Sequence, residues 1–170
     1  PLGVGTTQDI LPGQNIEYVI RFQNTGTDTA FTVVIRDTLS TDLDIFSVIS
    51  GASSDDYIFR MYGPRVLEWT FHNIMLPDSN SNEPASHGFV KFKVDQAANL
   101  PQGTLIENSA SIYFDFNATI FTNTYFHTIH ENILTIDVDK ITSEQMQVKV
   151  YPNPTTGLVC IERGNTEQIS

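Results

Sequence analysis

Hydrophobic residues recur at every second position over most of the chain. Ile16, Tyr18, Ile20 and Phe22 are one such series, with mostly polar residues between them. Side chains of a β-strand point alternately to its two faces, so this period of two predicts a strand with one apolar face. Further series follow, separated by turn-forming residues, and a helical period appears only faintly, at residues 143–147. The other predicted strands contain Phe31, Val33 and Ile35; residues 43–50; Tyr57, Phe59 and Met61; Leu67, Trp69 and Phe71; Val90, Phe92 and Val94; Ile106, Ala110, Ile112, Phe114 and Phe116; and residues 118–130.

About eight short strands separated by turns are typical of an antiparallel β-sandwich. We therefore expect an all-β, immunoglobulin-like sandwich in which each sheet has a dry inner face and a wet outer face. Trp69, the sole tryptophan, should lie in the core between the two sheets. The polar residues 77–88 are predicted to form a surface loop between strands.

A change of pattern near the C-terminus predicts a short β-hairpin tail. Residues 148–151 form a brief strand, after which Pro152 and Pro154 remove two backbone donors and Gly157 permits a turn into residues 158–162. The predicted organisation is an N-terminal linker at residues 1–9, the sandwich at residues 10–132, a linker at residues 133–147, and the truncated start of a further module at residues 148–170.

Composition limits the classes of function. The chain has 170 residues, 40% of them hydrophobic, which suffices for a real core. Its net charge of −11 would repel phosphate backbones, so we expect no nucleic-acid partner. No stretch is apolar enough to cross a bilayer, and a signal peptide is missing before Pro1, so a processed piece of a larger protein is expected. The single cysteine, Cys160, excludes an internal disulfide and should be a small buried residue on a strand.

Motifs for catalysis are missing from the sequence, and no enzyme activity or cofactor is predicted. There is no Gly-x-Ser-x-Gly elbow, no glycine-rich phosphate loop and no His-Glu-x-x-His. The four histidines are expected at the surface or rim, with His127 and His130 on opposite faces of one strand. They are His72, His87, His127 and His130.

Acidic residues near predicted strand ends raise the possibility of a structural Ca²⁺ at one pole of the sandwich. Calcium takes six to eight oxygen ligands, including backbone carbonyls of irregular segments. The more economical interpretation is ordinary turn chemistry, in which Asp and Asn bond to the local backbone. The weak candidates are Asp37, Asp42 and Asp44, placed around one turn, with Asp115 and Asn117 at the end of another strand.

Asn108 is in phase with the apolar residues of its predicted strand, which points its amide toward the dry face. A buried amide needs hydrogen-bond partners, and we expect them in the backbone of a neighbouring strand or loop. An isopeptide crosslink to a lysine is the alternative. Lys91 and Lys93 are predicted on the opposite face from their apolar neighbours, which argues against it.

Aromatic residues on the less apolar faces of the last two predicted strands suggest a binding surface. Tyr113, Phe121 and Tyr125 could stack on sugar rings or anchor a protein, or could simply be cross-strand pairs that stabilise the sheet. Two short strings, Asp-Thr-Ala at residues 28–30 and Asp-Thr-Leu at residues 37–39, also resemble an acceptor motif for O-glycosylation.

Two family resemblances extend this interpretation. The tail resembles the start of the C-terminal sorting domain of proteins that Bacteroidota export through the type IX secretion system, which implies export to or beyond the cell surface. Residues 18–30, 33–39 and 108–115 are similar to DUF11-like repeat domains of bacterial surface proteins over roughly residues 10–129, which implies an immunoglobulin-like stalk or adhesive unit without catalytic residues. The sorting resemblance is carried by Tyr151, Pro152, Asn153, Pro154 and Gly157.

The sequence therefore predicts a non-catalytic spacer module of a secreted or surface-exposed protein. Its expected partners are neighbouring domains of the same polypeptide and, through the tail, the secretion machinery. The alternative is an adhesin-type module that binds carbohydrate or protein through exposed aromatics or loops, and self-assembly of copies is a further possibility.

Overall fold

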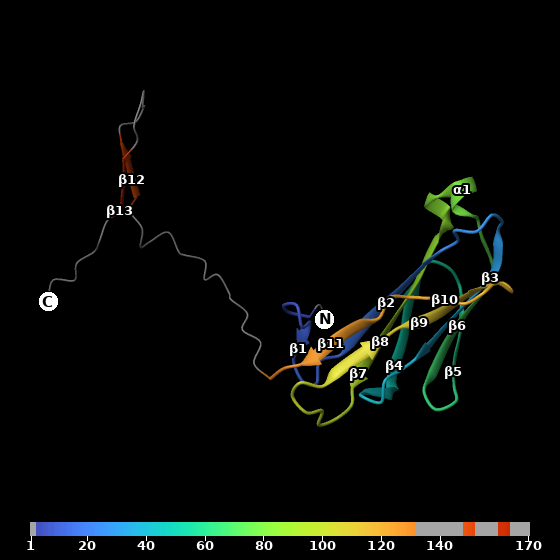
Figure 1. Cartoon of the computed structure of the whole chain (residues 1–170), viewed down its shortest axis with the longest axis horizontal. Helices are drawn as coiled ribbons and strands as arrows, with labels where there is room; N and C mark the ends of the chain where they lie inside the picture. Colours follow the sequence, from blue (N-terminus) through green and yellow to red (C-terminus); the bar gives the residue numbers. More distant parts are fainter. Residues whose placement is uncertain (1–2, 132–147, 152–159, 164–170) are drawn as a thin grey trace. The chain divides into compact units, whose positions relative to one another are not determined.

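A computed structural model describes residues 3–131, 148–151 and 160–163. The chain divides into two compact units, residues 1–133 and residues 134–170. Almost all regular structure is β, which confirms the predicted fold class (Figure 1). The strands are β1 Asp9–Ile10, β2 Ile16–Gln23, β3 Ala30–Thr38, β4 Leu43–Ser53, β5 Ile58–Tyr62, β6 Val66–Leu76, β7 His87–Gln96, β8 Leu105–Asn108, β9 Ala110–Phe114, β10 Ile120–Phe121, β11 Tyr125–Ile129, β12 Val148–Tyr151 and β13 Cys160–Arg163.

The first unit is built from three sheets with the strand orders β10-β9-β3-β6-β5, β2-β7-β4 and β1-β11-β8. Only Ser109 separates β8 from β9, so these two strands continue one another across two of the sheets. The described strand pairs are antiparallel except for β1 with β11, which is parallel. In the second unit, β12 pairs antiparallel with β13, which confirms the predicted hairpin.

A hydrophobic core lies between the β2-β7-β4 sheet and the β10-β9-β3-β6-β5 sheet. Trp69 of β6 is fully buried, and its ring lies 5.1 Å from that of Phe92 on β7. The ring of Phe22 on β2 lies 5.4 Å from that of Phe71 on β6. Aromatic contacts at these distances join the two layers, and Trp69 occupies the place predicted for it.

The alternating pattern of β2 is observed as predicted, with Ile16, Tyr18, Ile20 and Phe22 all buried. Similar alternation in β6 and β7 buries the residues expected there. These strands follow the sequence pattern because their pairing with neighbours is continuous over the residues concerned.

Three residues of the predicted apolar series are exposed instead. Met61 is 48% exposed on β5, which is an edge strand of its sheet. Phe31 is 52% exposed because β3 is irregular between Ala30 and Thr32, which reverses the alternation ahead of Val33. Phe116 is fully exposed, since β9 ends at Phe114 and Asp115 adopts a positive φ of 50°. The prediction of a single strand from Ile106 through Phe116 was therefore wrong at its end.

The predicted last strand, residues 118–130, is divided into β10 and β11. Ile120 lies opposite Ile112, whereas Tyr125 lies opposite Asn108, so the β10–β11 segment contains one more residue than its partner between these pairs. An extra residue reverses the faces of the side chains that follow it. The register of β11 could not be read from that of β10.

The segment at residues 77–88 is more ordered than the surface loop predicted from its polarity. It contains the short helix α1 Ser79–Asn82 and a 3-10 turn, Pro84–Ser86, before β7 begins. Asp78 caps α1 by accepting hydrogen bonds from the backbone of Asn80 and Ser81, a common use of Asp at helix starts. No helix in the described part of the chain is long and apolar enough to cross a membrane.

Candidate functional site

A buried polar pair lies between β3 and β8. Asp37 is fully buried, and its Oδ2 accepts a 2.7 Å hydrogen bond from Nδ2 of Asn108, which is itself buried. Asp37 lies directly opposite Ala110, so the adjoining strand brings Asn108 to it. The amide of Asn108 therefore bonds to a side-chain carboxyl group rather than to the backbone acceptor expected from the sequence.

Burial raises the pKa of the Asp37 carboxyl to about 7, although the hydrogen bond from Asn108 acts to lower it. Oδ1 of Asp37 and Oδ1 of Asn108 have no hydrogen-bond partner among the described residues. A proton on Asp37 Oδ1 would give this buried, unpartnered oxygen a hydrogen to donate. The geometry and the raised pKa thus both favour the neutral acid.

Tyr18, on β2 of the facing sheet, belongs to the same polar region. Burial raises the pKa of its hydroxyl, and the charge of Asp37 raises it further. The ring of Tyr18 makes an edge contact with that of His127 at 6.3 Å. His127 is 2% exposed, so the prediction of a surface or rim position was wrong for this histidine. The reason is the extra residue before β11, which turns His127 to the inside.

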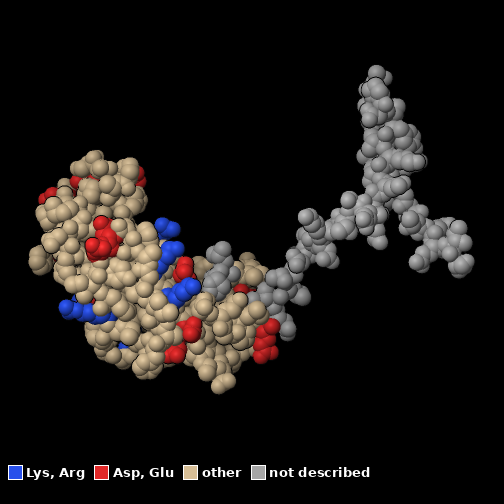
Figure 2. Space-filling model, turned by 180° about the vertical axis from the view of Figure 1, so that it is seen from behind, with Lys and Arg blue, Asp and Glu red and all other residues tan. Residues whose placement is uncertain are grey.

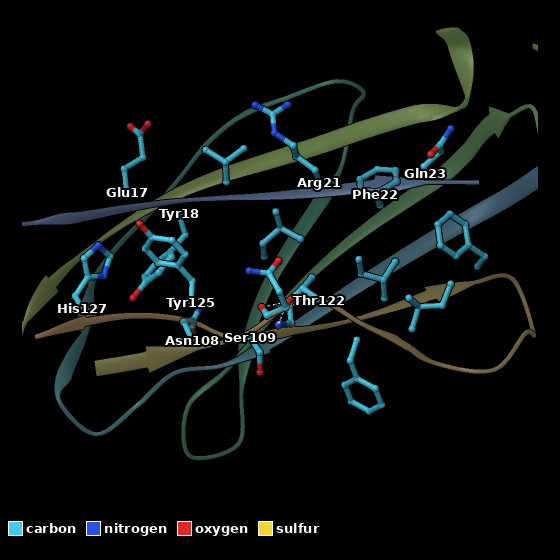
Figure 3. Close-up of a pocket in the computed structure, with 18 residues that line it drawn as sticks. Glu17, Tyr18, Arg21, Phe22, Gln23, Asn108, Ser109, Thr122, Tyr125 and His127 are labelled. Carbon is cyan, nitrogen blue, oxygen red and sulfur yellow. Dashed lines mark hydrogen bonds between the residues drawn. The ribbon is translucent and has the colours of Figure 1, made fainter. Parts of the chain in front are cut away.

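A groove of about 490 Å³ opens beside this region (Figure 3). One wall is β2 from Glu17 to Gln23, and the other is formed by β9, β10 and the start of β11. Figure 3 shows Tyr18, Tyr125 and His127 close together on one side of the groove and Phe22 on the other. Its lining is mainly apolar, with Glu17 and Arg21 as its charged residues. Such a surface suits an extended or apolar ligand better than a reaction that needs converging acids and bases.

The calcium candidates do not come together. The backbone of Asp115 bonds to Thr32, so Asp115 and Asn117 lie at the start of β3, whereas Asp42 and Asp44 follow its end. A nine-residue strand separates these positions by about 25 Å. Asp37 is inside β3 rather than in the turn where it was expected.

Asp115, Asp42 and Asp44 each use a carboxylate oxygen in a local hydrogen bond. The carboxylate of Asp115 accepts from the backbone nitrogens of Phe31 and Thr32, at 3.1 and 2.7 Å. Asp42 Oδ2 accepts from Ser40, and Asp44 Oδ1 accepts from the nitrogen of Phe46. Among the described residues no group of three or more His, Cys, Asp and Glu could hold a metal. Figure 2 shows acidic side chains in small separate groups on one face of the molecule.

A side chain that the sequence analysis missed provides the positive charge at the β3–β4 turn. The guanidinium of Arg65 donates to the carbonyl oxygens of Leu39 at 2.9 Å and Ser40 at 2.6 Å, and also to that of Leu43. Backbone carbonyls of this kind are calcium ligands in other proteins. Here they are bound by an arginine instead.

The three predicted surface aromatics lie in different surroundings. Tyr113 is half-buried on the outer face of β9, with the Arg36 guanidinium 5.0 Å from its ring centre. Phe121 is 72% exposed at the groove, and Tyr125 is 38% exposed with its hydroxyl donating to Gln8 Oε1. Phe121 and Tyr125 both line the groove, whereas Tyr113 does not.

The lysines considered for a crosslink to Asn108 lie on the strand β7. Lys93 is exposed, and Lys91 Nζ lies 3.6 Å from Glu17 Oε1 on the outer face of the sheet. Asn108 faces the interior with Asp37. The geometry thus places neither Lys91 nor Lys93 for a crosslink at Asn108.

The sorting-motif residues fall mainly outside the described residues. Tyr151 ends β12, while Pro152, Asn153, Pro154 and Gly157 lie outside the description, as do the linker at residues 133–147 and the faint helical pattern. Cys160 begins β13.

Residues 3–128 match the model of a family described as a domain of unknown function, DUF7619. The chain belongs to this family. No curated protein matches it. The family match ends before the tail, and the resemblances to DUF11-like repeats and to a type IX sorting domain stay predictions.

Two of the solved structures that match this chain are a pilin subunit and a collagen-binding subdomain. The major pilin subunit BcpA of Bacillus cereus is 14% identical with a TM-score of 0.50, over 71% of this chain and 36% of the pilin. A collagen-binding subdomain of the Enterococcus faecalis surface protein ACE is 12% identical with a TM-score of 0.44, over 71% of this chain and 92% of that one. The likeness to the pilin shows a shared fold, and this chain spans about a third of the pilin's length.

The Asp37–Asn108 pair could have been suspected from the sequence. Asp37 is in phase with the buried Val33 and Ile35, just as Asn108 is in phase with Ile106 and Ala110. A polar residue in phase with an apolar face signals a buried group that needs a partner. The identity of that partner could not be inferred, because the two residues are 71 positions apart.

Proposed function

We propose that this chain is a non-catalytic structural module of an exported bacterial surface protein. The observation that carries the proposal is the continuous core, in which aromatic rings from both sheets interlock around Trp69. Tyr18 and His127 lie on the wall of the groove, and Asp37 is held against Asn108 inside the sandwich. A rigid sandwich of this kind suits a spacer that positions neighbouring domains.

The finer assignment follows from the sequence. The sandwich at residues 10–132 would separate the preceding domains of the polypeptide from a sorting signal that starts at residue 148, with residues 133–147 as the linker. Secretion or display at the outer cell surface, through the type IX machinery of Bacteroidota, is part of this proposal. A DUF11-like role in a stalk would be consistent with it.

A fusion experiment tests the proposal. A reporter enzyme joined ahead of the full chain would be expressed in a bacterium with a type IX system. We expect to find the reporter at the cell surface or in the medium. When residues 148–170 are deleted, we expect the reporter to stay inside the cell. Replacing residues 10–132 with an unrelated sandwich of similar length should preserve export. Loss of export on that replacement, or export without the tail, would contradict the proposed roles.

The groove supports a second candidate function, an adhesin-type binding module. Phe121 is well exposed there and Tyr125 is partly exposed, and exposed aromatics can stack on sugars or anchor a protein. A glycan array and a protein pull-down with the full chain would test it. Binding that is lost in Phe121→Ala and Tyr125→Ala but retained in Tyr113→Ala would favour this function, because Tyr113 lies outside the groove.

A further inference from the structure

Strand β2 is an unusually regular sheet edge. It ends the β2-β7-β4 sheet, and all eight of its residues pair with β7 without a register shift. The other edges are shorter or irregular: β5 has five residues, β10 has two, and β4 is interrupted by register shifts. A long regular edge exposes backbone groups to which another strand can bind, and proteins usually block such edges.

The direction of the free backbone groups follows from two hydrogen bonds. The nitrogen of Asn24, immediately after β2, donates to the oxygen of Ser86, immediately before β7, at 2.9 Å. On the far side of β7, the oxygen of Phe89 accepts from Ser54. Backbone groups in an antiparallel ladder alternate between the two neighbours, so the even-numbered residues of β2 bond to β7. The odd-numbered residues therefore direct their N–H and C=O groups outward; they are Glu17, Val19, Arg21 and Gln23.

Apolar side chains surround this edge. The outward side of β2 is a wall of the groove, and the opposite rim carries Ile120, Phe121 and Tyr125, which are 48%, 72% and 38% exposed. Val19, at the middle of β2, is itself 38% exposed. Exposed apolar groups beside unpaired backbone are typical of a surface that is covered in an assembly.

The charges on β2 are arranged symmetrically about Val19. Glu17 lies two residues before it and Arg21 two residues after it, and both point to the outer face of the sheet. We propose that two copies of this chain associate by pairing β2 with β2 of the second copy, antiparallel and centred on Val19. In this register Glu17 faces Arg21 of the second copy, and Arg21 faces Glu17 of the second copy.

The charges select this register over its neighbours. Backbone bonding between the outward groups requires odd-numbered residues to face odd-numbered residues. Centring the pair on Glu17 or on Arg21 would set like charges opposite each other, which destabilises a sheet. Centring it on Tyr18 or on Ile20 also aligns odd-numbered residues, but it leaves every charged side chain opposite an uncharged one. Centring on Val19 provides two opposite-charge pairs and about six backbone hydrogen bonds from three residue pairs. The occupant of the edge is therefore a second copy of the same strand.

Pairing of this kind would join the two β2-β7-β4 sheets into one continuous sheet across a two-fold axis. The same surface serves both copies, as in most closed homodimers. The proposal does not depend on the spacer role, since it concerns how copies associate and not what the module carries.

Sedimentation velocity of the full chain tests the pairing. We expect a concentration-dependent dimer between about 10 μM and about 1 mM, the range in which small interfaces associate. Arg21→Glu and Glu17→Arg should each weaken the dimer roughly tenfold or more, because like charges then face each other. An equimolar mixture of these two variants should form a heterodimer, since opposite charges face again.

A second variant tests the backbone bonds themselves. Val19→Pro removes an outward N–H that β7 does not use, so the domain should keep its melting temperature while the dimer is lost. Arg60→Glu, which makes the same charge change at the exposed edge strand β5, is the matched control and should leave association unchanged.

Four results would overturn the proposal. They are a wild-type chain that stays monomeric throughout this range, a dimer that survives Arg21→Glu, a mixture of the charge variants that fails to associate, and association that is equally weakened by Arg60→Glu. A dimer that Val19→Pro abolishes but the charge variants do not affect would mean that a different segment occupies the edge, and this too rejects pairing of β2 with itself.

Discussion

Asn108 donates a 2.7 Å hydrogen bond to Asp37 inside the sandwich, and the two residues come from strands 71 positions apart in the chain. Both side chains lie on apolar faces of their strands, where an unpaired polar group would cost about 1–3 kcal/mol. The pair therefore fixes how β8 and β9 align with β3. It also places a titratable group in the core, which has consequences for stability.

Stability should fall as the pH rises through neutrality. Burial raises the pKa of Asp37 from 3.8 to about 7, so the folded protein holds this proton more tightly than the unfolded chain. The resulting stabilisation is fully present below pH 4 and is lost as the pH rises through 7. Linkage converts the interval between the two pKa values into about 4 kcal/mol. Urea unfolding at several pH values between 4 and 8 would measure the loss.

The variant Asp37→Asn removes this titration and still accepts the hydrogen bond from Asn108. Its unfolding free energy should depend less on pH than that of the wild type and should exceed it at pH 8. Asp55→Asn, at an exposed loop position, is the control and should keep the wild-type pH profile. Parallel pH profiles for the wild type and Asp37→Asn would show that Asp37 ionises normally in the fold.

Removing only one member of the Asp37–Asn108 pair should lower the free energy of unfolding more than removing both. Asn108→Leu leaves the buried carboxyl of Asp37 without its donor, and we expect a loss of about 1–3 kcal/mol, or more when Asp37 is charged. The double variant Asp37→Leu/Asn108→Leu should recover part of this loss because no polar group is then left buried. A double-mutant cycle by urea unfolding measures the coupling; additive losses would mean that the two side chains do not interact.

Gly88 should not tolerate a side chain. It lies opposite Phe22 in the β2–β7 ladder, and a Cβ at this position would overlap the Phe22 ring. Gly88→Ala should therefore destabilise the domain by about 1–3 kcal/mol, the usual cost of overpacking. In the Phe22→Leu background the same substitution should cost less, since the ring is gone. Thermal unfolding of the four proteins tests this; an equal cost in both backgrounds would rule out the overlap as the cause.

Asp115 should stabilise its turn without calcium. Its carboxylate accepts hydrogen bonds from the backbone nitrogens of Phe31 and Thr32, so Asp115→Ala should cost about 1.5–3 kcal/mol. Asp115→Asn, which keeps one acceptor and tolerates the positive φ, should cost less. The melting temperature of the wild type should be the same in calcium and in EDTA. A clear rise in calcium that Asp115→Ala abolishes would instead indicate a metal site.

How far the sequence predicts the fold can be judged from single strands. In β2 the alternation identified every buried residue, because an eight-residue strand paired without interruption keeps its faces throughout. In β3 and β9 the same rule failed at Phe31 and Phe116, where a register shift and a positive φ interrupt the ladder. Such irregularities leave little trace in the pattern of apolar residues.

The candidate site was less predictable than the fold. The acidic residues were expected at one pole, but antiparallel pairing places Asp115 at the start of β3 and Asp42 beyond its end. Beyond the end of β3, the positive charge comes from Arg65. Its guanidinium donates hydrogen bonds to backbone carbonyl groups more than 20 residues earlier in the chain. No local spacing rule identifies such a partner.

The sequence alone determined that this protein is a sandwich of antiparallel strands with Trp69 at its centre. That information is local, because each strand specifies its own two faces through the order of apolar and polar residues. Only the tertiary structure decided that Asp37 meets Asn108 and that β2 presents its odd-numbered residues at an open edge. Those relationships depend on which strands become neighbours and in which register, and they arise from the packing of the whole domain.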